Sequence, residues 1–156
     1  MIDPRVRRPA DKAELITRLA GESDSAIFSS MRDLFVFAAA LGKIEERRKA
    51  VTKVAKDPIR LDLFRSDAGH DLLIQALAVL ANPGDAEILR DDRVDERIQV
   101  FEEYINGGLE LIAEHLEAGK LQSDDEVLMA LVNGYIEQRN PASRVDLSQF
   151  ADDLGL

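Results

Sequence analysis

The two histidines and the carboxylates near them are the residues whose types could support metal-dependent or hydrolytic chemistry. Glu110 and Glu114 lie four residues apart, so on a helix they share a face from which carboxylates could ligate a metal. His115 points about 100° away from Glu114 on the same helix. His70 stands beside Asp71, and no second histidine-bearing helix completes a site. We therefore interpret these residues as solvated polar surface.

A second acidic group, Asp91, Asp92, Asp95 and Glu96, could hold Mg²⁺ in a nuclease. It stands at a predicted helix start, where acids are favoured by the helix dipole alone, and we prefer that interpretation. The chain has no phosphate-binding glycine loop, nucleophile elbow or dinucleotide motif, and no cysteine. The sequence therefore predicts no catalytic residue, metal or cofactor, and a protein that is not an enzyme.

Basic residues form the remaining group with a chemical role, because they could contact DNA phosphates. One set is an arm flanked by proline, and the other follows the chain from residue 43 to residue 60. The predicted nucleic-acid-binding residues are Arg5, Arg7, Arg8, Lys43, Arg47, Arg48, Lys49, Lys53, Lys56 and Arg60. Glu45 and Glu46 interrupt the second set, and no aromatic residue interleaves with it for stacking on bases. A solvated face, or a surface for an acidic partner protein, explains it equally well.

The charge is divided unevenly along the chain. Residues 1–60 hold 13 Lys/Arg against 9 Asp/Glu, a net of +4, whereas residues 61–156 hold 7 against 21, a net of −14. Such asymmetry can indicate a half that faces nucleic acid. It can equally indicate two faces that neutralise each other in the folded protein, and the overall charge of −10 opposes non-specific phosphate binding.

Hydrophobic periodicity predicts the elements that must position these groups. Capping residues, glycine stops and apolar spacing predict five principal helices, at about 11–20, 30–42, 67–81, 94–118 and 124–138. The helix containing Met31–Leu41 is apolar nearly all round, so we expect it at the centre, with Leu72–Leu80 packed against it. Alternation over residues 59–63 predicts one short extended segment.

Within the longest helix, an apolar stripe is predicted to be buried: Ile98, Phe101, Ile105, Leu109, Ile112 and Leu116. Gly107 and Gly108 interrupt this helix, so either it kinks there or another backbone crosses closely. The fold class expected is all-α, a compact domain of about five helices with at most one short β-hairpin. We expect a basic arm over 1–10, one helical domain over 11–140 and a C-terminal tail over 141–156.

The start of the chain has no apolar stretch after its basic residues, so it does not resemble a signal peptide. The longest apolar run, Leu34 to Leu41, is far shorter than the ~20 residues of a membrane helix. We therefore expect a cytoplasmic protein that does not bind membranes.

Three segments together resemble one known family: RVRRPADKAEL, FSSMRDLFVFAAALG and FEEYINGGLELI. The chain is similar to the DNA phosphorothioation-associated protein 4 family over about residues 5–140. Matching positions run in order through Phe28, Asp33, Leu34, Phe37, Ala38, Ala39, Leu41 and Gly42, and through Phe101, Glu102, Tyr104, Gly107 and Gly108. These are mostly core residue types, so the resemblance carries over no catalytic residue.

Members of this family are encoded beside systems that place sulfur in the DNA backbone and restrict DNA lacking it. The resemblance implies a non-catalytic accessory component of such a restriction or antiphage defence system. Its expected partners are other proteins of that modification or restriction complex, with double-stranded DNA and a homo-oligomer as open alternatives. A DNA-binding transcriptional regulator of the cluster is the second hypothesis, for which only residues 43–56 could supply a basic recognition helix. A metal-dependent nuclease using residues 91–96 is the third.

Overall fold

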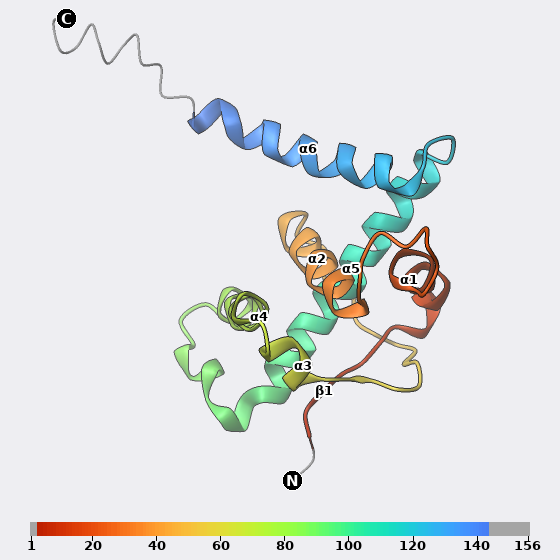
Figure 1. The fold of residues 1–156 in the computed structure, drawn as a ribbon. Helices are drawn as coiled ribbons and strands as arrows, with labels where there is room; N and C mark the ends of the chain where they lie inside the picture. Colours follow the sequence, from red (N-terminus) through yellow and green to blue (C-terminus); the bar gives the residue numbers. More distant parts are fainter. Residues whose placement is uncertain (1–2, 144–156) are drawn as a thin grey trace, which may run out of the picture. The chain divides into compact units, whose positions relative to one another are not determined.

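The structure, a computed structural model, describes residues 3–143 and consists mainly of α-helices (Figure 1). Its elements, with short 3₁₀ helices marked η, are β1 (Arg5–Val6), η1 (Ala10–Lys12), α1 (Ala13–Ala20), α2 (Met31–Ile44), β2 (Ile59–Arg60), α3 (Leu61–Arg65), α4 (Ala68–Ala81), η2 (Ala86–Leu89), η3 (Asp91–Arg93), α5 (Val94–Ala118) and α6 (Asp124–Ser143). Strands β1 and β2 pair antiparallel, with Arg5 opposite Arg60 and Val6 opposite Ile59. The predicted all-α class, with one short β-pairing, is confirmed over the described residues.

Contacts within the chain separate it into two compact units, residues 1–114 and residues 115–156, and the division falls inside α5. The boundaries expected at residues 10 and 140 stay predictions. In the second unit, the backbone amide of Ser123 donates to the Glu126 carboxylate at 3.2 Å, a contact typical of the capping box at the start of a helix. Helix α6 continues to Ser143, beyond the predicted end near residue 138. The rest of the expected tail lies outside the described residues.

Helix α5 occupies the centre of the first unit, a place that the sequence assigned to Met31–Leu41 (Figure 1). The stripe predicted on α5 is buried along its whole length, from Ile98 to Leu116. Three polar residues of the same helix, Arg97, Glu102 and Asn106, are also buried. An amphipathic helix normally turns such polar residues toward solvent, so α5 presents a broader buried surface than its apolar stripe indicates.

A close backbone crossing explains Gly107 and Gly108. A Cβ atom added to Gly108 would lie within 3.0 Å of the Ala38 backbone in α2, and one added to Gly107 would lie equally close to the Arg47 carbonyl. A Cβ on Gly42 of α2 would meet the Tyr104 carbonyl of α5. The two helices therefore pack backbone to backbone at this point, which only glycine allows. Of the two explanations that the sequence left open, close approach is the correct one.

Two local expectations are corrected by the structure, and the conformation of residues 47–58, which the sequence left open, is resolved. Extended backbone covers only Ile59–Arg60 of the predicted 59–63, because Leu61 and Phe64 are both buried and their i, i+3 spacing suits a turn of helix α3. Residues 47–58 form no helix, and their backbone instead pairs with the arm and with α5. Helix α4 packs by one face only, so Leu72 and Leu80 are exposed rather than core residues.

Candidate nucleic-acid interface

The ten predicted phosphate-binding residues lie on the arm, the C-terminal turn of α2, the loop that follows it, and β2. The arm and the loop run antiparallel and form a two-stranded ribbon. Beyond the β1–β2 pair, Pro9 bridges Val54, the Ala10 amide donates to the Lys53 carbonyl at 2.8 Å, and the Ala55 amide donates to the Arg8 carbonyl at 2.9 Å. The structure thus brings the arm and the basic segment side by side.

Arg7 is bound by Glu102 of α5. The Arg7 backbone amide donates to Glu102 Oε1 at 2.7 Å, and its guanidinium donates to Glu102 Oε2 at 2.7 Å through Nη2 and at 3.0 Å through Nε. The Glu102 side chain is 2% exposed and that of Arg7 is 48% exposed. Hydrogen bonding to Glu102 raises the pKa of Arg7. The arm is therefore anchored by a buried carboxylate, and Arg7 is occupied.

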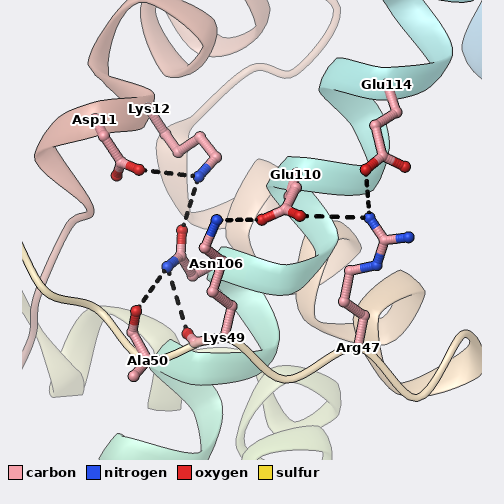
Figure 2. Close-up of polar contacts among 8 residues, drawn as sticks. All are labelled: Asp11, Lys12, Arg47, Lys49, Ala50, Asn106, Glu110 and Glu114. Atoms are coloured by element: carbon pink, nitrogen blue, oxygen red, sulfur yellow. Dashed lines mark hydrogen bonds and ion pairs between the residues drawn. The ribbon is translucent and has the colours of Figure 1, made fainter.

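Carboxylates of α5 also form ion pairs with the basic side chains in the first part of the loop (Figure 2). The Arg47 guanidinium lies 2.7 Å from Glu114 and 3.7 Å from Glu110, and the Lys49 ammonium pairs with Glu110. The hydrogen bond from Lys49 lowers the pKa of Glu110, and the same bond raises the pKa of Lys49. These glutamates therefore neutralise the loop instead of facing solvent alone.

Two further cations gather around Tyr104. Arg48 pairs with Glu103 at 2.6 Å, and its guanidinium carbon lies 5.5 Å from the Tyr104 ring centroid. Lys43 pairs with Glu46 at 2.7 Å and lies 6.0 Å from the same centroid. Both distances fall within the range of cation–π attraction. The basic loop itself contains no aromatic residue, and Tyr104 of α5 provides one. Its ring contacts Arg48 and Lys43 of the same chain.

Asn106 holds the turn of the loop against α5 (Figure 2). Its amide nitrogen donates to the carbonyls of Lys49 and Ala50 at 3.3 and 3.2 Å, and its carbonyl oxygen accepts from Lys12 Nζ at 3.1 Å. Sequence reasoning missed Asn106 and Glu102 as anchors. Their signal was a polar residue at a helical position flanked by buried ones, Glu102 after Phe101 and Asn106 after Ile105.

The remaining predicted cations are Arg5, Arg8, Lys53, Lys56 and Arg60. Arg60 pairs with Asp3 at 3.1 Å and with Asp62. Arg5, Arg8, Lys53 and Lys56 form no ion pair with any residue that the structure describes. Six of the ten predicted cations are thus paired with carboxylates, and four are left with uncompensated charge.

The acidic groups considered for metal chemistry are also engaged. Arg93 lies 2.8 Å from Asp85 and 2.7 Å from Glu96, and Arg90 lies 3.1 Å from Asp92. Within residues 3–143, no three His, Asp or Glu side chains gather where they could hold a metal ion.

These features describe a mainly helical protein in which Arg47, Arg48 and Lys49 of the basic segment pair with carboxylates of the central helix α5. The chain belongs to the family of DNA sulphur modification system-associated protein 4, whose sequence model matches residues 5–150. The resemblance seen in the sequence is thereby confirmed. No curated protein and no solved structure matches the chain. The family is thus associated with a DNA sulphur modification system. None of the described helices is long and apolar enough to span a membrane.

Proposed function

We propose that this protein is a non-catalytic accessory component of a DNA phosphorothioation-linked restriction and antiphage defence system, and that it works by binding a partner protein of that system. The observation that carries the proposal is the exposed apolar face of α4. Leu72, Val79 and Leu80 are 67%, 40% and 58% exposed, whereas Ile74, Leu77 and Ala78 on the opposite side are buried.

The exposed α4 residues form a stripe at helical spacing, i, i+7 and i+8. A solvent-facing helix surface normally carries polar residues at these positions, and contiguous apolar surface commonly marks an interaction site. Covering a leucine side chain stabilises a complex by roughly 1.5–3 kcal/mol before the costs of association. The two leucines alone are therefore enough to influence binding strongly.

Charge near the stripe indicates the kind of partner. Residues 61–89 contain five carboxylates and one arginine. Asp62, Asp71 and Asp85 pair with arginines, which leaves Asp67 and Glu87 without an ion-pair partner among the described residues. A protein surface with an apolar centre and a basic rim complements this region. The partner proposed is such a protein from the same sulphur modification cluster.

The two alternative functions have less support. A regulator would need residues 43–56 as a recognition helix, but residues 47–58 are irregular and are bound to α5 and the arm. A nuclease would need carboxylates at 91–96 free to ligate a metal, and Asp92 and Glu96 pair with arginines.

Pairwise co-purification tests the proposal. The tagged protein is co-expressed with each protein of the cluster in turn, as the wild type and as the variant Leu72→Gln/Leu80→Gln. Leu121→Gln is the matched control, because Leu121 is 98% exposed and lies outside α4. We expect one defined partner to be retained by the wild type and by the control, and lost with the double variant.

Retention of that partner by the double variant, or retention of none by the wild type, would contradict the proposal. Light scattering during size-exclusion chromatography adds a further outcome. A dimer of the wild type that the double variant converts to monomer would assign the α4 face to a second copy of this chain instead.

A further inference from the structure

We infer that the ribbon formed by residues 4–10 and 53–61 contacts the phosphate backbone of double-stranded DNA through Arg5, Arg8, Lys53 and Lys56. This inference goes beyond the proposed function, because binding a partner at α4 does not require it. It also separates these four residues from the other six predicted cations, whose charges are already compensated.

The first argument is electrostatic. Of the ten predicted cations, the six paired ones gain little from a phosphate, since binding it would require breaking an existing ion pair. Arg5, Lys53 and Lys56 are exposed and have no carboxylate partner among residues 3–143. Releasing condensed counterions from DNA requires uncompensated cations of this kind.

Arg8 adds a fixed positive charge. Its guanidinium donates to two neutral acceptors, the Lys56 carbonyl and the Met31 sulfur at 3.8 Å, so it is held in place while its charge stays uncompensated. Its Nε, which is enclosed, has no hydrogen-bond partner. A positioned guanidinium loses less entropy than a free one when it binds an oxyanion.

The ribbon is a defined backbone platform. The Leu61 amide donates to the Pro4 carbonyl at 2.9 Å, the Ala10 amide closes the other end on Lys53, and Val6 is fully buried beneath. Between the Val6–Ile59 and Pro9–Val54 pairings the loop uses two more residues than the arm. This excess forms a bulge that contains Lys56 and Asp57, the latter at φ 61°.

The length of the platform suits a short stretch of duplex. From Arg5 to Ala10 a strand advances about 17 Å, which corresponds to about five base-pair steps of DNA. Asp57 lies on the ribbon, and Asp3 and Asp62 at its end pair with Arg60, so these three carboxylates weaken the positive field of the ribbon. The contact is therefore expected to be weak, independent of DNA sequence and sensitive to salt.

Fluorescence anisotropy with a labelled 24-base-pair duplex, titrated at salt concentrations from 50 to 200 mM, tests the inference. Four phosphate contacts predict a slope of about −3.6 in log K against log salt, or about a 150-fold loss of affinity over this range. Lys53→Ala/Lys56→Ala should halve the slope, leaving about a 12-fold loss.

The matched control is Arg47→Ala/Arg48→Ala, which removes the same charge from paired residues and should leave the slope unchanged. Circular dichroism confirms that each variant is folded. Equal slopes for the two double variants, or no binding by the wild type at 50 mM salt, would overturn the inference. Because these variants leave α4 intact, partner retention would be unaffected, and the two proposals can fail separately.

Discussion

Replacing Gly108 with alanine should separate backbone packing from helix propensity. In an ordinary helix interior the change stabilises by about 1 kcal/mol, because glycine is the poorer helix former. At Gly108 the new methyl would lie within 3.0 Å of three backbone atoms of Ala38, whereas ordinary contact begins at 3.4 Å. Helix α2 would have to retreat from α5 by more than about 1 Å, and rigid backbone cannot rotate away as a side chain can.

Such a shift disturbs the fully buried neighbours of Ala38 in α2, Leu34 and Phe35. Overpacking of a core costs about 1–3 kcal/mol, so we expect Gly108→Ala to lower the melting temperature by roughly 2–12 °C. The control is Gly134→Ala in α6, where an added Cβ meets nothing within 4 Å. That variant should be neutral or more stable, by up to about 1 kcal/mol.

Thermal and urea unfolding followed by circular dichroism measure both variants. The opposite signs are the test, because the chemical change is the same in both helices. A Gly108→Ala protein as stable as the wild type would refute the close crossing of α2 and α5.

Three further predictions follow from the buried groups. Arg7→Ala should lower the free energy of unfolding by about 3 kcal/mol, because it leaves the buried Glu102 carboxylate without its cation. Glu102→Gln should cost less, and urea midpoints that rank the two variants the other way would contradict this. Leu77→Ala should cost about 2–5 kcal/mol, because Leu77 is 1% exposed, and a loss below 1 kcal/mol would contradict its core position. The lowered pKa of Glu110 stabilises the fold above the unfolded-state value of about 4.3, and this contribution is lost as the pH falls through the lower folded-state pKa. The stability difference between wild type and Glu110→Gln, measured in urea, should therefore shrink from pH 7 to pH 3, and a constant difference would exclude this role.

Local signals predicted the helices well, because caps and periodicity act within one element. Ser30 accepts a hydrogen bond from the Asp33 amide at 3.1 Å, as its capping pattern indicates. The stripe from Ile98 to Leu116 was correct for the same reason. The partners of the basic loop could not be predicted, because Arg47 and Glu114 are 67 residues apart and only the tertiary fold brings them together.

The acidic character of α5 was interpreted as solvent exposure, and this is where the sequence misled most. Charge alone does not distinguish a carboxylate facing water from one facing an arginine, as Glu102 and Glu114 show. The division into +4 and −14 was nevertheless informative. Part of it reflects two segments that neutralise each other within the first unit.

The anchoring of the arm by Glu102 has a consequence for synthesis of the protein. Arg7 is synthesised before its partner Glu102, which is 95 residues further along the chain. At typical rates of 5–20 residues per second the arm therefore waits roughly 5–20 s before it can be secured. Helix α2 is likewise synthesised before Gly107 and Gly108 of α5, against which it packs. The arm and α2 are thus synthesised before the helix that holds them in their native positions.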